Sequence, residues 1–175
     1  MKISVFVGTS VDGFIARPDD TLDFLSVRGA GPNGYEEFVA TVDVHVIGRR
    51  TFETVLGFDA WPYGKKPVIV LTNHPRTLKP PKGANCEAMA GSPGQIVTRL
   101  AKRGFRHIYV DGGKTIQKFL RAGLVQRLVV TRVPVLIGDG IPLFGDLERD
   151  VRLKHVTTRV IRGGLVQTEY RVLPS

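Results

Sequence analysis

The sequence has a single cysteine, Cys86, among its 175 residues, so a disulfide within the chain is excluded. The four histidines are scattered, and no group of Cys and His has the spacing of a zinc site. No apolar run approaches the roughly 20 residues that cross a bilayer, and Asp12 interrupts the first apolar run too early for a signal peptide. We therefore expect a soluble, cytoplasmic protein with no membrane association and no metal.

Acidic residues are also few, since 16 Asp and Glu stand against 25 Lys and Arg and give a net charge of +9. Such a balance favours an anionic partner, which is either nucleic acid or a phosphorylated small molecule. The basic residues are dispersed, and no recognition helix or RNA-binding motif accompanies them, so we do not expect a nucleic-acid partner. Scattered solvated charge and a phosphate pocket both remain open as explanations. The length suits one domain spanning residues 1–175.

Strand-like and helix-like segments alternate along the first two thirds of the chain. The strand-like segments are Lys2–Ser10, Val44–Ile47, Pro67–Leu71 and Ile108–Val110, and the helix-like ones are Tyr35–Val42, Phe52–Leu56, Pro93–Arg103 and Thr115–Leu120. A strand-rich segment follows at Gln126–Ile137, with Pro134 implying a bend or an edge. The chain ends in two alternating strands, Val151–Val160 and Leu165–Leu173, joined by a glycine turn. This order predicts an α/β domain with a mixed sheet and an antiparallel end.

The segment around Asp111-Gly112-Gly113 carries the clearest functional signal, because a short strand runs through a two-glycine turn into a helix. A helix N-terminus presents free backbone N–H groups, and its dipole favours an anion. Glycine lets a large anionic group approach the backbone, and Lys114 adds a positive charge. We expect a Cβ atom at Gly112 or Gly113 to collide with such a ligand. An ordinary turn without a ligand is the alternative.

Two further strand ends carry similar groups. Gly48-Arg49-Arg50-Thr51 opens a helix after one strand, and Thr72-Asn73 closes another. Ligands of open parallel sheets bind beyond the carboxyl ends of the strands, so three such ends together predict a long ligand with several phosphates. A dinucleotide with an extra phosphate fits this description. The GxGxxG fingerprint is absent, which argues against a Rossmann domain.

Five motifs in this order resemble the dihydrofolate reductase-like superfamily. They are SVDGFIA (Ser10–Ala16), IGRRTFE (Ile47–Glu53), PVIVLTN (Pro67–Asn73), VDGGKTIQKFL (Val110–Leu120) and PVLIGDGIPLF (Pro134–Phe144). Within it, the sequence is most similar to the reductase domain of bifunctional riboflavin-biosynthesis proteins and its stand-alone bacterial relatives. The resemblance implies a three-layer α/β/α fold with a mixed, mainly parallel sheet and an antiparallel C-terminal hairpin.

The resemblance also implies NADPH as the cofactor. It matches Gly8 and Ile15 to backbone positions beside the nicotinamide carboxamide. It matches Gly48, Arg49, Arg50 and Thr51 to a phosphate-binding segment, and Leu71, Thr72 and Asn73 to the side of the adenosine ribose and 2′-phosphate. The pyrophosphate turn is matched by Asp111, Gly112, Gly113, Lys114 and Thr115.

The sequence departs from folate reductases at one position. Their pterin is held by an acid early in the helix that Tyr35–Val42 represents here, whereas this chain has Gly34 or Tyr35 at that register. We therefore do not expect folate as the substrate. The activity that the resemblance implies is reduction of 5-amino-6-(5-phosphoribosylamino)uracil. Reduction of dihydrofolate or another pterin, and an NADPH-binding module without turnover, stay as alternatives.

Hydride transfer often needs a proton donor and a substrate wall. Asp12 and Glu37 are the acidic candidates, although Asp12 also suits a turn with Gly13 and Glu37 suits solvent. The residues considered for the substrate wall are Phe24, Phe38, Trp61 and Leu136, with Thr131 as a polar contact; plain core is the alternative for the apolar ones. The C-terminal hairpin leaves an edge that invites pairing, and we expect a homodimer through it.

Overall fold

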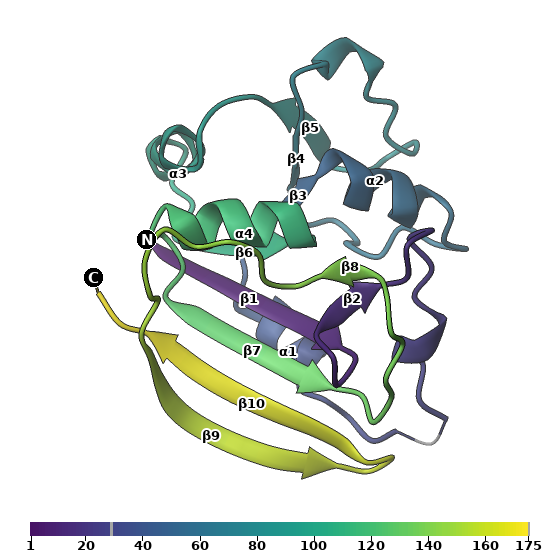
Figure 1. Ribbon diagram of the computed structural model, residues 1–175. Coiled ribbons are helices and arrows are strands. Elements are labelled where there is room, and N and C mark those ends of the chain that lie inside the picture. Colours follow the sequence, from purple (N-terminus) through teal and green to yellow (C-terminus); the bar gives the residue numbers. More distant parts are fainter. Residues whose placement is uncertain (29, 175) are drawn as a thin grey trace.

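The computed structural model describes residues 1–28 and 30–174, and Figure 1 shows their arrangement. Eight strands form one sheet in the order β5-β4-β3-β6-β1-β7-β10-β9. The pairs from β5 to β7 run parallel, and the last two pairs run antiparallel. The strands of this sheet are β1 (Lys2–Thr9), β3 (Val44–Gly48), β4 (Val68–Leu71), β5 (Cys86–Met89), β6 (His107–Asp111), β7 (Arg127–Arg132), β9 (Leu153–Ile161) and β10 (Leu165–Val172). The predicted mixed, mainly parallel sheet with an antiparallel hairpin is thus confirmed.

Helices cover both faces of the sheet and make three layers. They are α1 (Tyr35–Ala40), α2 (Arg49–Leu56), α3 (Pro93–Lys102) and α4 (Gly113–Arg121), and two short 3-10 turns lie at Asp23–Leu25 and Pro75–Thr77. On one face, Phe38 of α1 packs on Phe6 of β1, and α2 packs on β3 and β4. On the other face, α3 and α4 bury Ile96, Ile116 and Phe119 against the sheet. Strands covered on both faces read as continuous apolar runs, which is why the parallel strands are visible in the sequence.

Three short strands were not predicted from the sequence. The strand β5 is half-exposed at the sheet edge, and its sequence Cys-Glu-Ala-Met contains no β-branched residue. The strands β2 (Phe14–Ala16) and β8 (Ile141–Pro142) form a separate two-stranded sheet that was not predicted from the sequence. The segment predicted as strand up to Ile137 is a strand only to Arg132, because Pro134 lacks an N–H group and bends the chain.

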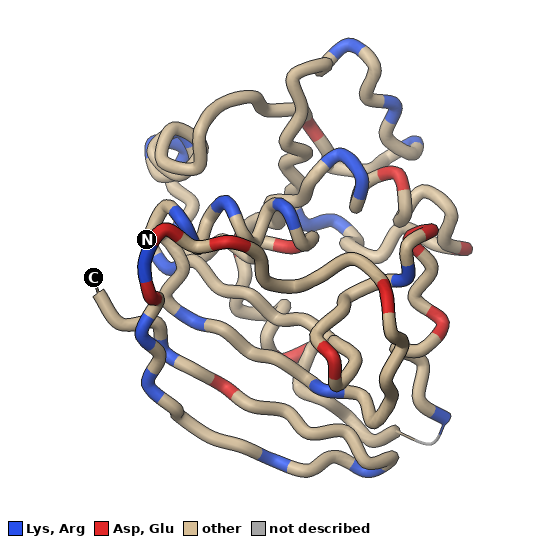
Figure 2. Tube along the Cα trace, viewed as in Figure 1, with Lys and Arg blue, Asp and Glu red and all other residues tan. Residues whose placement is uncertain are grey.

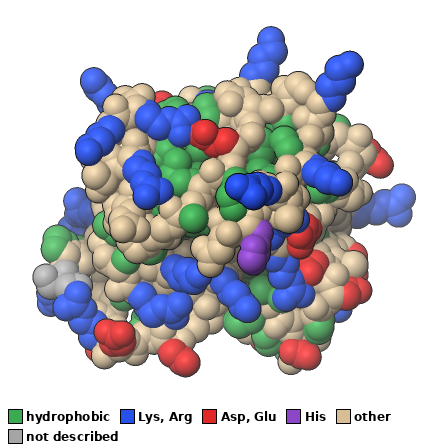
Figure 3. Space-filling model, turned by 90° about the horizontal axis from the view of Figure 1, so that it is seen from above, with side chains coloured by type: hydrophobic (Ala, Val, Ile, Leu, Met, Phe, Trp, Pro, Cys, Tyr) green, Lys and Arg blue, Asp and Glu red, His purple; other side chains and the backbone are tan. Residues whose placement is uncertain are grey.

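The parallel strands end at one edge of the sheet, where the N-termini of α2 and α4 also begin. Lys and Arg are distributed along the whole trace rather than in one block, as Figure 2 shows, and the view from above in Figure 3 shows the same scatter. Among the helices that the structure describes, none is long and apolar enough to cross a membrane. The described residues also contain no group of three or more His, Cys, Asp or Glu that is placed to hold a metal ion.

Candidate functional site

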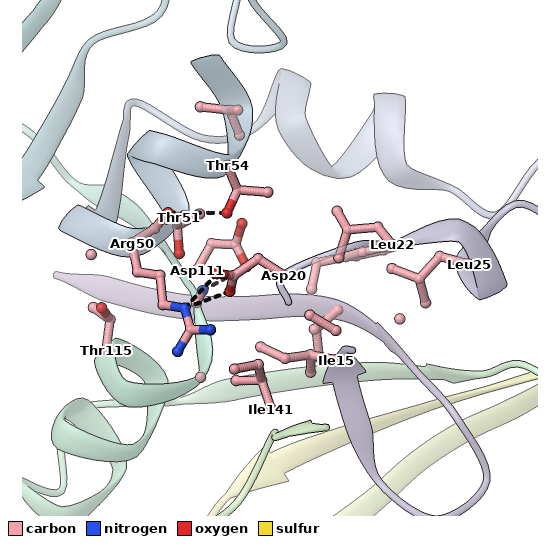
Figure 4. A pocket seen from close by; sticks show the side chains of 18 of the residues that line it. Ile15, Asp20, Leu22, Leu25, Arg50, Thr51, Thr54, Asp111, Thr115 and Ile141 are labelled. Atoms are coloured by element: carbon pink, nitrogen blue, oxygen red, sulfur yellow. Dashed lines mark hydrogen bonds and ion pairs between the residues drawn. The ribbon is translucent and has the colours of Figure 1, made fainter. Parts of the chain in front are cut away.

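A cavity of about 650 Å³ runs along this edge of the sheet, from the end of β4 to the start of β10 (Figure 4). Leu71 of β4 lies at one end of its lining and Leu165 of β10 at the other. The loop between β2 and the first 3-10 turn borders the mouth through Asp20 and Leu22. The cavity therefore follows the line of strand ends that the sequence marked as a ligand site.

Two helix N-termini face each other across the cavity. Gly48 precedes α2 and Gly112 precedes α4. A Cβ atom on Gly48 would lie 2.7 Å from Thr115 Oγ1, and one on Gly112 would overlap Thr51 Oγ1. Gly112 also has a φ of +91°, which side chains rarely adopt. Two glycines, two threonine hydroxyls and two sets of free N–H groups therefore form one narrow cradle, whose chemistry suits an anion.

Four cationic side chains line the same end of the cavity, two from α2 and two from α4. They are Arg49, Arg50, Lys114 and Lys118. The Arg49 guanidinium is anchored by Glu53 at 2.7 Å and by Thr77 Oγ1 at 2.9 Å. The Arg50 guanidinium lies 2.6 Å from the Asp20 carboxylate and donates to the Pro18 carbonyl at 3.0 Å. Arg50 thus ties the mouth loop to α2 in this structure.

The cavity lining also contains Asp111 and three tyrosines, Tyr35, Tyr63 and Tyr109. Asp111 Oδ1 accepts the Gly112 N–H at 2.7 Å, and burial raises the pKa of its carboxyl group. The Tyr109 hydroxyl donates to the Phe6 carbonyl at 2.7 Å. Burial raises the pKa of Tyr35 to about 12 and raises the pKa values of Tyr63 and Tyr109, with the nearby Asp111 charge adding to each shift. The three phenols are therefore neutral hydrogen-bonding groups at neutral pH.

Most residues predicted to hold the cofactor come together in the cavity lining. These are Gly8, Ile15, Gly48, Arg49, Arg50, Thr51, Leu71, Asp111, Gly112, Gly113, Lys114 and Thr115. Thr72 and Asn73 do not line it, because the chain turns away after β4 and Thr72 Oγ1 accepts the His74 N–H. A Cβ atom on Gly113 would lie 2.8 Å from the Pro142 carbonyl oxygen, so this glycine lets α4 pack on β8.

The predicted acids lie elsewhere. The Asp12 carboxylate accepts the backbone N–H groups of Ile137 and Gly138 at 3.1 and 2.8 Å, and so it joins two loops. A side-chain hydrogen bond from Ser10 lowers its pKa further. Glu37 is exposed on the outer side of α1. Neither residue lines the cavity, and a catalytic role for Asp12 or Glu37 stays a prediction.

Among the predicted substrate residues, only Thr131 lines the cavity. Phe24 is buried beside Arg17, Phe38 is buried between Phe6 and Tyr109, and Trp61 packs on Phe52 and Tyr63. Leu136 is 71% exposed, away from the cavity. Large apolar side chains suit a buried core and a cavity surface equally well. The sequence alone therefore could not decide which of these residues line the cavity.

Sequence reasoning did not select Tyr63, Tyr109, Asp20 or Lys118 for the site. Tyr109 had a usable signal, because it points to the face opposite Ile108 and Val110 near the end of a strand that leads into the glycine turn. Lys118 also had one, since it lies one helical turn after Lys114. Tyr63 belongs to an irregular connection, and Asp20 to a loop, and neither has a periodic pattern.

Comparisons with known proteins agree with this architecture. The sequence model of the RibD C-terminal domain family matches residues 1–167. The uncharacterized protein YwjB of Bacillus subtilis is 30% identical over 172 residues, which cover 97% of each chain. A crystal structure from Shewanella sp. PV-4, named "Putative riboflavin biosynthesis protein", is 37% identical with a TM-score of 0.89 and covers 99% of both chains.

More distant structures share the fold alone. A deaminase/reductase of Thermotoga maritima, named for 5-amino-6-(5-phosphoribosylamino)uracil reduction, has a TM-score of 0.75 at 15% identity; the match covers 98% of this chain and 56% of that one. The dihydrofolate reductase of Enterococcus faecalis, solved with NADP(H), has a TM-score of 0.68 at 18% identity over 98% and 96% of the chains. The chain belongs to the RibD C-terminal domain family and has the dihydrofolate reductase-like fold that its motifs predicted.

Proposed function

We propose that this protein is an NADPH-dependent reductase of a small molecule. The observation that carries the proposal is the cradle between the N-termini of α2 and α4, where Gly48 and Gly112 face Thr115 and Thr51. Backbone N–H groups and hydroxyls aimed at one point suit a pyrophosphate. The cations beside the cradle exceed what an uncharged ribose diol needs, which supports NADPH over NADH.

The residues present fit a dinucleotide from end to end. The cradle and Lys114 would hold the pyrophosphate, and Arg49, fixed by Glu53 and Thr77, would face the 2′-phosphate. Gly8 and Ile15, on β1 and β2, would border the nicotinamide ring, which supplies a hydride when the cofactor is bound. The chain itself contributes position and exclusion of water.

The cavity also contains groups able to hold or donate a proton. Asp111, with its raised pKa, and the three tyrosine hydroxyls lie there, whereas Asp12 and Glu37 do not. This supports turnover rather than a module that only binds NADPH. The riboflavin-pathway pyrimidine is the first substrate to test, because the Thermotoga neighbour, which shares the fold, carries that activity in its name.

A binding experiment tests the proposal. NADPH is titrated into wild-type protein, Thr51→Val and Thr98→Val, with binding followed by isothermal titration calorimetry. Thr51 faces the cradle, whereas Thr98 lies outside the cavity lining and its hydroxyl donates to the Gly94 carbonyl of its own helix at 2.9 Å, so Thr98→Val is the matched control. A hydrogen bond to a charged group is worth about 1.5–3 kcal/mol, so Thr51→Val should weaken binding roughly 10-fold or more. Equal affinity in all three proteins would contradict the proposal.

A further inference from the structure

We propose that the substrate of this cavity is an uncharged, unphosphorylated ring compound that carries hydrogen-bond acceptors. The inference rests on the proposed function, since it concerns the part of the cavity that the cofactor would leave free. We call this part the tyrosine half; it is lined by Phe6, Asn33, Tyr35, Tyr63, Thr131 and Leu165.

In the described part of the chain, positively charged side chains lie at only one end of the cavity lining. The four cations of its lining, Arg49, Arg50, Lys114 and Lys118, all belong to α2 and α4 at the cradle end. No lysine, arginine or histidine lines the tyrosine half among the residues that the structure describes. A phosphate in the tyrosine half would therefore be desolvated without a cationic partner, which is costly.

Arg159 lies beside the tyrosine half but does not line it. Its guanidinium donates to Gln167 Oε1 at 2.9 Å and to the carbonyl of Asn33, which is part of the tyrosine half. A phosphate group on the substrate would have to compete with these contacts to gain Arg159 as a partner.

The His45 imidazole, which lies behind Tyr63 and Tyr109, adds no positive charge to this part of the cavity. Its ring is fully buried between Tyr63 and Tyr109, with ring-centroid distances of 4.8 and 5.3 Å. Burial lowers the pKa of His45 to about 4, so the imidazole is neutral at neutral pH. Among the residues that the structure describes, no cation lies in the wall of the tyrosine half, and the Lys66 ammonium near His45 donates to the Val42 carbonyl at 2.6 Å.

What the tyrosine half does offer is aromatic surface and neutral polar groups. Phe6 and Tyr35 meet edge to face at 5.5 Å, and Tyr35 and Tyr109 do so at 6.3 Å. Protonated tyrosine hydroxyls donate hydrogen bonds, so they recognise carbonyl or ring-nitrogen acceptors. Aromatic walls with a few polar groups are typical of sites for planar, mostly apolar ligands.

Matched pairs of ligands test this inference. The wild-type protein, saturated with NADP⁺, is titrated with 5-amino-6-ribosylaminouracil and its 5-phosphate, with riboflavin and its 5′-phosphate, and with uridine and its 5′-phosphate. We expect the uncharged member to bind at least 10-fold more tightly in every pair that binds. Tyr63→Phe should weaken that binding about 3- to 10-fold, as loss of one hydrogen bond does.

A second variant checks that charge is the cause. Phe58 lines the cavity after the C-terminal end of α2, about 12 Å from the cradle by the length of that eight-residue helix, and it is 44% exposed. Phe58→Arg should reduce the preference for the uncharged member several-fold.

The outcomes separate the two proposals. Equal or tighter binding of the phosphorylated member by wild-type protein would overturn the inference. Failure of every pair to bind a protein that still binds NADP⁺ would overturn it as well. A protein that does not bind NADP⁺ or NADPH would contradict the proposed function, and the inference would fall with it.

Discussion

The ion pair between Arg50 and Asp20 yields a prediction in which two partners of one contact act in opposite directions. Both line the cavity mouth, and their charged groups lie 2.6 Å apart. If Arg50 pairs with a cofactor phosphate, Asp20 competes with that phosphate for the guanidinium and repels it. Asp20→Asn should then strengthen NADPH binding, whereas Arg50→Ala should weaken it.

The magnitudes follow from exposure. The Arg50 and Asp20 side chains are 52% and 31% exposed, and pairs this exposed are worth about 0–1 kcal/mol. Release of Arg50 by Asp20→Asn should therefore tighten NADPH binding by up to about fivefold. Loss of a charge-assisted phosphate contact in Arg50→Ala should cost roughly 1–3 kcal/mol, or about 5- to 150-fold.

Calorimetric titration at low and physiological salt gives both values, and salt should shrink both effects. Asp23→Asn is the matched control, because it breaks the 2.6 Å Arg17–Asp23 pair on the same loop outside the cavity lining and should leave NADPH affinity unchanged. Weaker binding in both Asp20→Asn and Arg50→Ala would show that the pair only holds the loop. That result would contradict the pairing of Arg50 with a cofactor phosphate.

Four further predictions concern the fold, the assembly and the substrate. Gly113→Val should lower the unfolding temperature with and without NADPH, because the valine side chain would meet the Pro142 carbonyl. Gly112→Ala should lower the unfolding temperature and also reduce the rise in that temperature that NADPH induces. Equal NADPH-induced rises for both variants would contradict this. Unfolded histidine titrates near 6.5 and buried His45 at about 4, so the unfolded state binds more protons between these values and the free energy of unfolding should fall by about 3 kcal/mol from pH 6.5 to 4. Urea unfolding of His45→Leu should lack that part of the decrease, and an unchanged pH dependence would contradict the assignment. The edge strand β9, exposed from Leu153 to Val160, should pair in a homodimer, and light scattering that gives the mass of one chain at micromolar concentration would exclude it. Purified protein should reduce dihydrofolate poorly, since Gly34 or Tyr35 stands at the register where folate reductases carry an acid, and efficient turnover in a steady-state assay would overturn this.

The sheet was predictable because its signals are local. Parallel strands buried on both faces are apolar throughout, and each of the strand ends at Gly48 and Asp111 is followed by a helix start. Both ends of the cradle were visible in the sequence for this reason. The strand β5 was not, since its position depends on pairing with β4 at the sheet edge rather than on its own residues.

The substrate side of the cavity was not predictable in the same way. Its lining is assembled from β1, α1, β7, β10 and irregular connections that carry Asn33 and Tyr63, and no sequence period links them. Large apolar residues such as Phe38 and Trp61 looked equally suited to a wall, but packing placed them in the core. Asp12 had two chemically reasonable roles, and only its contacts with Ile137 and Gly138 distinguish them.

We propose that the cradle and its cations hold a dinucleotide with a 2′-phosphate. The most direct test is calorimetric titration of wild-type protein with NADPH and with NADH in the same buffer at physiological salt. Because Arg49 would face the 2′-phosphate, which only NADPH carries, we expect NADPH to bind at least 10-fold more tightly than NADH, a difference in binding free energy of about 1.4 kcal/mol. Equal dissociation constants for the two cofactors, or no binding of either, would contradict it.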